Sequence, residues 1–458
     1  MIVALLAAAG AFAGPPAASP PPAIPALRHW QAAPGSFALR QSSRVVGSGT
    51  EAALLARELK LPLAAGAPPQ PGDIELRLGS SDRRLGREGY RLDVGASVGI
   101  EGRTSAGVFY GTRTLLQLLR RGRIPAGTAR DWPRYPERGL MLDNGRRYFT
   151  PAWIKRQIEL LAELKLNQLH LHFSDNEGFR IESESHPEVV SEQHLTKRQV
   201  RDIVEFARRR HVRVIPELDM PGHLRQALAA HPELRLPGST DALDISLPAA
   251  RRFCRELILE YLDLFGGRYW HAGADEYQGA TGEAYVDFIN WIDRLVRARG
   301  RTLRIWHDGL SGDRLNRDVI VEWWADHAGP SPKRLLLQGH RVLNAGWWPT
   351  YYVAGGPLSA VHPSVKVAYE TWQVNLFGGL AINSPIPANP LQRVSASSRR
   401  VLGSELHVWN DVPFTETPAE IARAIAPRLA VLAQKTWDTR PPARGYDGFL
   451  RLWNRVRR

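Results

Sequence analysis

Short apolar runs alternate with amphipathic helical patterns over most of the chain. From residue 138 onward there are eight apolar runs of strand length, and most are separated by stretches with the spacing of an amphipathic helix. The runs are GLMLD, NQLHLHF, HVRVIPELD, RYWHAGAD, RTLRIWHD, VIVEWW, HRVLNAGWW and RVLGSELHVW. Strands that alternate with helices form parallel sheets, and eight such units predict a (β/α)8 barrel. An open doubly wound sheet is the alternative, but no glycine-rich nucleotide loop follows the first strand.

The residues before this region show a different arrangement. Short strand-like runs (IELRLG, YRLDV and SVGIEG) lie among the helical stretches TEAALLARELK and GVFYGTRTLLQLLRRG. The segment DWPRYPERG then interrupts the pattern with two prolines. The expected fold class is therefore α/β, with a small α/β domain over residues 36–130 that precedes a catalytic (β/α)8 TIM barrel over residues 131–458.

The first residues have the composition of a targeting segment. Residues 1–13 form an apolar run of signal-peptide length that ends in a small-x-small pattern, although a basic region before it is missing. Residues 14–35 are rich in proline and alanine and predict an extended linker. No later apolar run reaches about 18 residues, so no membrane span is expected. These features predict a secreted, extracellular protein.

The chain is basic, but its charge is dispersed. It has 60 Lys and Arg residues against 46 Asp and Glu residues, a formal net charge of +14. The arginines are scattered, and only the segment RLWNRVRR forms a dense basic cluster. This pattern favours a general preference for arginine over binding to an acidic polymer, so no nucleic-acid partner is expected. The single cysteine, Cys254, excludes an internal disulfide framework and a cysteine-rich metal site.

Polar and aromatic residues recur where the predicted barrel strands end. These residues are Asp143, Asp175, Asp219, His223, Asp275, Glu276, Trp306, Asp308, Trp324, Trp409 and Asp411. A barrel gathers the carboxyl ends of its strands onto one face, where barrel enzymes keep their active sites. A face with carboxylates and several indoles has the composition of a sugar pocket, because indoles stack on pyranose rings and carboxylates bind hydroxyl groups.

Asp275 and Glu276 are neighbours in the segment HAGADEYQ, and this adjacency restricts the chemistry. Neighbouring residues on a regular strand point to opposite faces, so both reach the site only if the chain turns there, as Gly273 permits. One carboxylate close to another keeps its proton more firmly and suits a general acid. Two neighbours do not straddle a glycosidic bond as acid and nucleophile must. A 2-acetamido group on the substrate would then be the nucleophile.

Four motifs carry a resemblance to a known family. RGLMLDNGRRYFT, LNQLHLHFSDNEGFRIE, VIPELDMPGH and HAGADE occur in the order and spacing of glycoside hydrolase family 20, the β-N-acetylhexosaminidases. The chain resembles that family over nearly everything after the linker, including the small domain before the barrel. The resemblance implies a retaining hydrolase that removes terminal β-linked GlcNAc or GalNAc through an oxazolinium intermediate. It implies a glycan as the partner and no metal or other cofactor.

The resemblance also implies individual roles. Asp275 would hold and polarise the acetamide N–H, and Glu276 would be the general acid/base, supported by Asp175 and His223. Arg138 would bind sugar hydroxyls at the floor of the pocket. The remaining matching positions, which would surround and bind the sugar, are Trp306, Trp324, Tyr351, Trp409 and Asp411. Asp411 stands where many members have Glu, so a shorter side chain would contact the sugar hydroxyl.

One position departs from the family pattern. Many members carry an Asp that contacts the outer hydroxyls of the sugar, and Val353 stands there in this chain. The loss of this polar group leaves room for a family member that releases a disaccharide, as a lacto-N-biosidase does. The insert before the last predicted strand is expected to add further contacts through Trp372.

Two other classes of function remain open at this stage. A metal-dependent hydrolase would use His170, His172, His223 and Asp275 as ligands. A non-catalytic glycan-binding barrel would keep the aromatic cleft without the chemistry, but the chain retains Asp275, Glu276, Asp175 and His223 together. The sequence makes no prediction of the oligomeric state.

Overall fold

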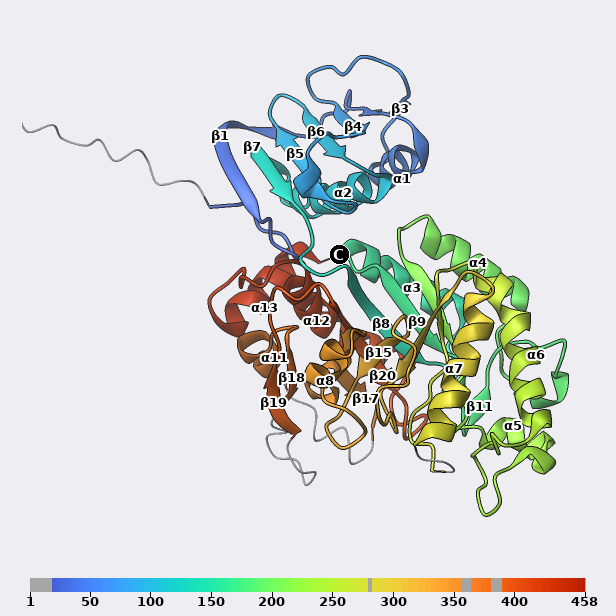
Figure 1. The fold of residues 1–458 in the computed structure, drawn as a ribbon. Coiled ribbons are helices and arrows are strands. Elements are labelled where there is room, and N and C mark those ends of the chain that lie inside the picture. Colours follow the sequence, from blue (N-terminus) through green and yellow to red (C-terminus); the bar gives the residue numbers. More distant parts are fainter. Residues whose placement is uncertain (1–18, 279–281, 356–363, 380–388, 458) are drawn as a thin grey trace, which may run out of the picture. The chain divides into compact units, whose positions relative to one another are not determined.

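The computed structural model describes residues 19–278, 282–355, 364–379 and 389–457 of the 458-residue chain (Figure 1). The expected signal peptide, residues 1–13, lies outside the described residues. The chain divides into two compact units. One comprises the described part of Met1–Pro22 with Leu27–Trp132, and the other comprises Ala23–Ala26 with Pro133–Arg458.

The first unit is a seven-stranded mixed sheet with helices. The strand order is β1-β7-β5-β6-β4-β2-β3. The strands are β1 (His29–Ala38), β2 (Val45–Val46), β3 (Leu63–Ala64), β4 (Ile74–Leu78), β5 (Tyr90–Val94), β6 (Val98–Gly102) and β7 (Arg123–Asp131). The helices are α1 (Gly49–Leu59), α2 (Ser105–Leu119) and the short 3-10 helix η1 (Arg83–Leu85). All three predicted strand runs and both predicted helices of this region are present. The predicted N-terminal α/β domain is confirmed.

The expected linker over residues 14–35 is wrong at its C-terminal end. Strand β1 begins at His29 and pairs antiparallel with β7, with His29 opposite Arg130. Its register shifts between Ala32 and Ser36, and Pro34 and Gly35 fall within that shift. Proline and glycine therefore occupy the irregular part of the strand, where no ladder hydrogen bond is needed. The composition of this segment resembles a linker, and only its pairing with a distant strand makes it part of the sheet.

The second unit is a closed parallel barrel, which confirms the predicted fold class. The eight barrel strands follow the eight apolar runs in order, and pairing of β16 with β20 closes the sheet. They are β8 (Glu137–Asp143), β9 (Gln168–His172), β12 (Arg213–Glu217), β13 (Tyr269–His271), β14 (Thr302–Trp306), β15 (Ile320–Trp323), β16 (Arg341–Asn344) and β20 (Val401–Trp409). Strand β17 (Tyr351–Val353) pairs with the C-terminal half of β20. Short hairpins are formed by β10 (Ser174–Asp175) with β11 (Gly178–Phe179) and by β18 (Leu376–Gly379) with β19 (Asn389–Arg393).

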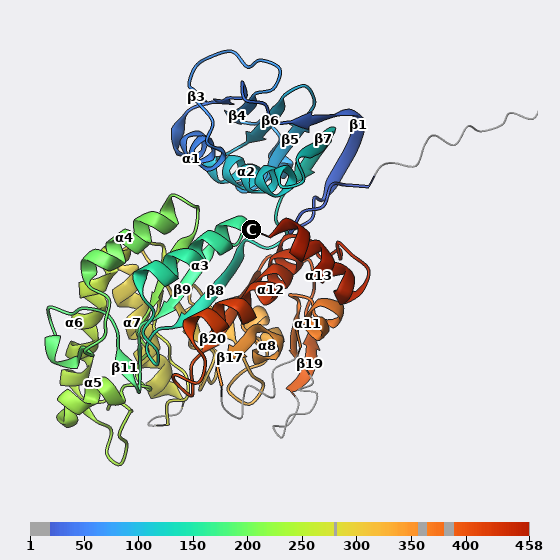
Figure 2. The same cartoon turned by 180° about the vertical axis from the view of Figure 1, so that it is seen from behind.

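Helices surround the barrel, and α3 and α12 lie over the side formed by β8, β9 and β20 (Figure 2). The described α-helices are α3 (Pro151–Glu163), α4 (Lys197–Arg208), α5 (Arg225–Ala230), α6 (Pro248–Phe265), α7 (Glu283–Arg297), α8 (Pro332–Leu337), α9 (Trp347–Thr350), α11 (Val365–Thr371), α12 (Pro418–Trp437) and α13 (Gly445–Val456), with 3-10 turns η2 (Pro187–Val189) and η3 (Pro232–Leu234). Capping residues set several of the helix starts. Thr150 caps α3 ahead of Pro151, and complete capping boxes begin α4 and α12. No helix of the described chain combines the length and apolarity that crossing a bilayer requires.

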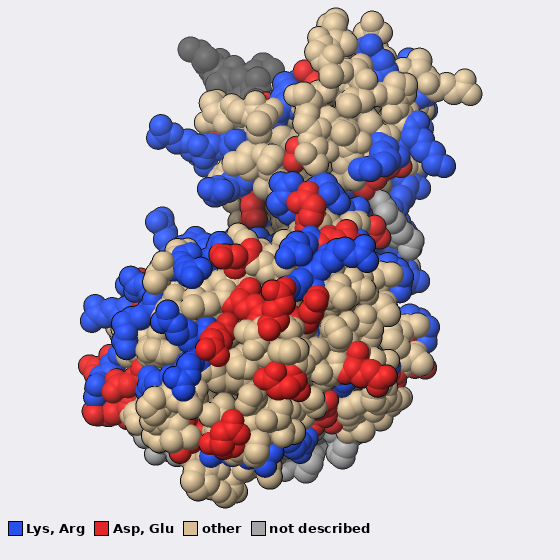
Figure 3. Space-filling view, turned by 90° about the vertical axis from the view of Figure 1, so that its right-hand side faces the viewer, with Lys and Arg blue, Asp and Glu red and all other residues tan. Residues whose placement is uncertain are grey.

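The barrel interior contains charged residues as well as apolar ones. The guanidinium of Arg304 is fully buried and lies 2.7 Å from Glu322 and 3.1 Å from Glu137. A buried charge is tolerated when it is paired in this way. On the surface in Figure 3, basic and acidic side chains lie among one another, and no single basic field covers that face. Cys254 is buried in α6, and the surrounding apolar residues raise the pKa of its thiol to about 12.

Candidate active site

A strained turn follows strand β13 and carries the two adjacent carboxylates. Gly273, Ala274 and Glu276 all have positive φ values, of 67°, 73° and 49°. Such values are uncommon for residues other than glycine, and they concentrate at functional sites. A Cβ on Gly273 would lie 1.8 Å from Asp219 Oδ1, so only glycine fits. The turn expected from the sequence is present.

Hydrogen bonds with two strand ends and with helix α7 hold this turn. The backbone N–H of Ala274 donates to Asp219 Oδ1 at 3.1 Å, and that of Glu276 donates to Asp308 Oδ1 at 3.2 Å. The hydroxyl of Tyr285 donates to the carbonyl of Ala274. Three elements thus fix a backbone shape that would be costly without them.

Asp275 and Asp219 form a closely coupled pair of carboxyl groups. Burial, followed by the charge of Asp275, raises the pKa of Asp219 well above its usual range. Burial also raises the pKa of Asp275, which the charge of His223 and a hydrogen bond with Asp219 oppose. Two carboxylates in contact share one proton more easily than they carry two charges. The rise in pKa is larger at Asp219 than at Asp275, which favours the proton on Asp219 and the ionised form of Asp275.

His223 lies between Glu276 and Asp175 and contacts both carboxyl groups. The Nε2 of His223 lies 3.4 Å from Glu276 Oε2 and 3.7 Å from Asp275 Oδ2, and its Nδ1 lies 3.3 Å from Asp175 Oδ1. The Glu276 side chain is 60% exposed, whereas Asp175 is buried. The close contact with His223 lowers the pKa of Glu276, against the effect of burial. The structure brings together all four residues that the sequence predicts as catalytic.

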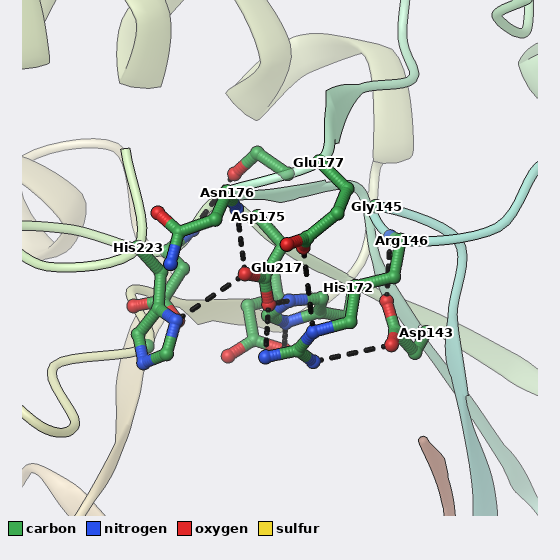
Figure 4. A network of polar contacts seen from close by, with 12 residues as sticks. Asp143, Gly145, Arg146, His172, Asp175, Asn176, Glu177, Glu217 and His223 are labelled. Atoms are coloured by element: carbon green, nitrogen blue, oxygen red, sulfur yellow. Dashed lines mark hydrogen bonds and ion pairs between the residues drawn. The ribbon is translucent and has the colours of Figure 1, made fainter. Parts of the chain in front are cut away.

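Asp175 is fixed by further contacts on both of its oxygens (Figure 4). Oδ2 lies 2.9 Å from Arg146 Nη2 and 2.8 Å from His172 Nε2, and Oδ1 accepts from the backbone N–H of Asn176 at 2.6 Å. Burial opposes the charge of Asp175, but Arg146, His172 and His223 together hold its pKa far below the usual range. Asp175 therefore remains an ionised acceptor for His223.

Arg146 is a candidate site residue that the sequence reasoning missed. Its guanidinium lies 3.1 Å from Asp143, 4.0 Å from Asp411 and 5.3 Å from the centre of the Trp409 ring. Asp143 is the last residue of β8 and Asp411 follows β20, so the group lies at the carboxyl-end face. The sequence could have indicated Arg146, because it comes after the GLMLD strand in the same motif that contains Arg138.

The predicted role of Arg138 is wrong. Arg138 is the second residue of β8, at the amino end of the strand, and it is fully buried. Its Nε and Nη2 donate to the carbonyl of Lys165, each at 3.0 Å, and its Nη1 donates to that of Tyr135 at 2.8 Å. The guanidinium also lies over the ring of Trp437. Strand polarity puts the amino ends of parallel strands at the face opposite the site, where such contacts stabilise the fold.

A pair of Arg→Lys variants tests this reassignment. Arg146→Lys is expected to lower kcat/KM by about 10- to 100-fold, because a charged hydrogen bond contributes about 1.5–3 kcal/mol and lysine lacks the planar fork. Arg138→Lys is expected to lower the free energy of unfolding by about 1–3 kcal/mol and to leave kcat/KM of the folded protein unchanged. Urea unfolding and steady-state kinetics measure the two effects. A large loss of turnover in Arg138→Lys with normal stability would restore the original assignment.

An aromatic wall borders the carboxylates. Trp306, Trp409 and Val353 belong to one buried cluster, against which Tyr351 and Trp324 pack. The ring centres of Trp306 and Trp409 are 5.9 Å apart, and those of Tyr351 and Trp409 are 5.8 Å apart. Pairing of β17 with β20 sets this arrangement, because it places Tyr351 beside His407 and Val353 beside Trp409. The predicted aromatic residues therefore lie together, with Val353 as an apolar part of the wall.

Hydrogen bonds orient two of the indoles. Trp306 Nε1 donates to Glu217 Oε1 at 2.9 Å, and Trp324 Nε1 donates to Asp308 Oδ2 at 2.5 Å. Asp308 thus holds both Trp324 and the backbone of Glu276. A cavity of about 380 Å³ opens at this point. Its lining comprises Glu276, Tyr277, Gln278, Tyr285, Asp308, Gly309, Trp324, His327 and Ala328.

Trp372 does not contribute to this site. Its side chain is 1% exposed, and the small space beside it is lined by residues of α9, β20, α11 and α12 on the outer side of the barrel. The expected contact of Trp372 with the substrate is therefore wrong. An indole this large is more often buried for packing than used for binding.

Comparison with known families supports the same assignment. Residues 135–285 and 279–440 match the model of the glycosyl hydrolase family 20 catalytic domain, and residues 21–132 match that of domain 2 of the same family. The chain belongs to glycosyl hydrolase family 20. The predicted family is confirmed, and the chain is a glycosidase rather than a non-catalytic glycan-binding barrel.

Characterised family 20 proteins resemble this chain over most of its length. It is 31% identical to a lacto-N-biosidase of Bifidobacterium bifidum, over 93% of this chain and 41% of that protein. It is 31% identical to a β-N-acetylhexosaminidase of Cellulomonas fimi, over 84% of this chain and 82% of that protein. A mutant of Streptomyces plicatus β-hexosaminidase in complex with its product GlcNAc superimposes with a TM-score of 0.79 at 27% identity, covering 95% of each chain.

The charges around the histidines of this family 20 site disfavour the metal hypothesis. Burial opposes charge on His170, but Glu217 beside it raises its pKa to about 9. Neighbouring carboxylates likewise raise the pKa values of His172 and His223 well above the usual range, against burial. A histidine that binds a metal must give up this proton, so protonation of these three rings competes with metal binding. The histidines are therefore better suited to organising carboxylates.

Proposed function

We propose that this chain removes terminal β-linked N-acetylhexosamine with retention of configuration, and that the 2-acetamido group of the substrate is the nucleophile. One observation carries the proposal. Asp275 and Glu276 lie next to each other on a single turn and both face His223, at 3.7 and 3.4 Å. A retaining enzyme with a protein nucleophile needs two carboxyl groups on opposite sides of the bond. Two neighbouring residues on one turn do not meet that requirement.

The arrangement assigns a task to each carboxyl group. In the first step Glu276 gives its proton to the glycosidic oxygen while the acetamide oxygen forms a bond to C1, and the aglycone leaves as an alcohol. The product is an oxazolinium ion, and ionised Asp275 accepts a hydrogen bond from its N–H and balances its charge. In the second step water attacks C1 and gives a proton to Glu276, while the bond between C1 and the acetamide oxygen breaks, which restores the 2-acetamido group and the β configuration.

Substrate binding would adjust the two pKa values in the directions that these steps require. A sugar over the exposed side of Glu276 removes water from that carboxyl group, which favours its protonated form. Positive charge that develops on the acetamide favours the ionised form of Asp275, and Asp219 can hold the proton that Asp275 does not. Arg146, Asp411 and Trp409 lie together and would bind the hydroxyl groups and the ring face of the sugar.

Release of a disaccharide is the second candidate. Val353 is 4% exposed and packs with Trp306 and Trp409, so this part of the wall offers no polar group to an outer hydroxyl. The Bifidobacterium bifidum relative, a lacto-N-biosidase, aligns with 93% of this chain. The second candidate would use the same carboxylates and the same chemistry, and it differs only in the length of the sugar bound beyond the first ring.

Product analysis tests the function and separates the two candidates. We expect turnover of the 4-nitrophenyl β-glycosides of GlcNAc and GalNAc, with the β anomer of the free sugar as the first product in proton NMR spectra. Oligosaccharides ending in chitobiose or lacto-N-biose then show whether a mono- or a disaccharide is released. Release of the disaccharide alone would favour the second candidate. An α anomer as the first product would contradict the proposed mechanism for both.

A further inference from the structure

His172 lies between two buried carboxylates. Its Nδ1 is 2.7 Å from Glu217 Oε2, and its Nε2 is 2.8 Å from Asp175 Oδ2. An ionised carboxylate only accepts hydrogen bonds, so both ring nitrogens must donate and the ring is an imidazolium. Burial opposes this charge, but the two carboxylates raise the pKa of His172 well above its usual range.

Buried groups hold the carboxylate of Glu217 in place. Its Oε1 accepts from Trp306 Nε1 at 2.9 Å and lies 3.0 Å from His271 Nδ1, and its Oε2 lies 3.0 Å from His170 Nε2. Glu217 and these three partners are at most 1% exposed. A carboxylate contacted on both oxygens by buried groups has little freedom to move. It is therefore a rigid support for His172.

The contacts continue from His172 toward the proposed acid. Oδ2 of Asp175 contacts His172 and Arg146, and Oδ1 of Asp175 contacts His223. His223 in turn faces Glu276. Carboxylates and imidazoles thus alternate from Glu217 through His172 and Asp175 to His223 (Figure 4). The contact of His223 with Glu276 extends this series to the proposed acid. Alternating charges of this kind stabilise each other in a buried site.

We propose that His172 is a positioning residue for proton transfer, because it links the fixed carboxylate of Glu217 to Asp175 and so sets the orientation of His223 and Glu276. The proposal rests on the proposed function, in which Glu276 is the general acid. Without His172, Asp175 keeps Arg146 on Oδ2 but loses the cation that ties it to the barrel interior. His223 and Glu276 then occupy a wider range of positions, and the proton is delivered less efficiently.

His170 provides a matched control on the same strand. His170 and His172 are alternate residues of β9, both are fully buried, and both contact Glu217 Oε2, at 3.0 and 2.7 Å. The second nitrogen of His170 faces Glu405 at 3.6 Å, whereas that of His172 faces Asp175. The loss of either ring removes a buried cation next to Glu217. Only the loss of His172 interrupts the contacts that lead to Glu276.

The test compares two aryl N-acetyl-β-glucosaminides on the full-length chain. One has a phenol leaving group that needs protonation, and the other has 2,4-dinitrophenol, which needs very little. His172→Gln is expected to lower kcat on the phenyl substrate by about 10- to 100-fold, since misplacing a catalytic group by about 1 Å costs up to that factor. Its kcat on the dinitrophenyl substrate should fall far less. His170→Gln should not change the ratio of the two rates, because a purely structural loss lowers both rates equally.

Other outcomes separate the inference from the proposed function. If Glu276→Gln shows the leaving-group effect and His172→Gln shows none, the positioning role is wrong and the proposed function stands. If Glu276→Gln shows no leaving-group effect, Glu276 is not the general acid, and the inference that depends on it is wrong as well. Should His172→Gln not fold by circular dichroism, Glu217→Gln replaces it, because it keeps an acceptor for Trp306 and removes the charge that supports His172. Equal losses on both substrates in a folded Glu217→Gln protein would then overturn the inference.

Discussion

Glu276→Gln is expected to lower kcat on phenyl N-acetyl-β-glucosaminide by about 10²- to 10⁴-fold, the usual contribution of general acid catalysis. The amide has the size of the carboxyl group but carries no proton that it can give to the glycosidic oxygen. The 2,4-dinitrophenyl substrate should lose much less activity, because its leaving group departs as a stable anion. Steady-state kinetics on both substrates measure the difference.

The control for this variant is an acidic residue away from the site. Glu283 lies at the start of α7, its side chain is 76% exposed, and it pairs with Arg314 on the surface. Glu283→Gln should leave both rates unchanged. Equal losses on the two substrates in Glu276→Gln would show that another residue donates the proton.

Asp275→Asn is expected to lower kcat by at least about 10²- to 10³-fold, the range found when one group that stabilises transition-state charge is removed. The positive charge of the oxazolinium ion lies on the former acetamide, next to Asp275. Asparagine keeps the shape of the side chain but cannot balance that charge. The loss should be similar for phenyl and dinitrophenyl substrates, because it affects formation of the ring and not protonation of the leaving group.

Two further measurements test the role of Asp275. A thiazoline that mimics the oxazolinium ion should inhibit the wild-type protein strongly and the Asp275→Asn variant weakly, since the inhibitor resembles the charged intermediate. Substrates with a 2-hydroxyl group in place of the acetamide should be almost inert with the wild-type protein. A covalent glycosyl adduct on any carboxylate, detected by mass spectrometry, would contradict the role proposed for the substrate.

The positions of the proposed catalytic carboxylates could be predicted because each lies close behind a barrel strand. The apolar runs define the strands, and parallel strands bring their carboxyl ends to one face whatever the details of packing. Asp175, Asp275 and Glu276 are therefore located by the pattern alone. Their adjacency also restricts the chemistry, because the distance between neighbours along a chain is fixed by covalent geometry.

Residues inside the strands could not be assigned in this way. Glu217 and His172 stand within apolar runs, where a polar residue reveals neither its partner nor its charge. Their contact joins residues of β9 and β12 that are 45 positions apart. His172 and Glu217 stand opposite each other on these neighbouring strands, and that pairing depends on strand register, which local sequence does not specify.

By itself the sequence determined the order of strands and helices, the barrel and the face on which the carboxylates and indoles gather, because these follow from hydrophobic periodicity and strand polarity. Only the tertiary structure decided which arginine reaches the site. Arg138 and Arg146 belong to one motif, but the strand between them carries them to opposite ends of the barrel. The tertiary structure also decided that His29–Ala38 is a strand, because its partner strand β7 lies far along the chain. Both outcomes depend on long-range contacts, whose free energy is gained only when the chain has folded.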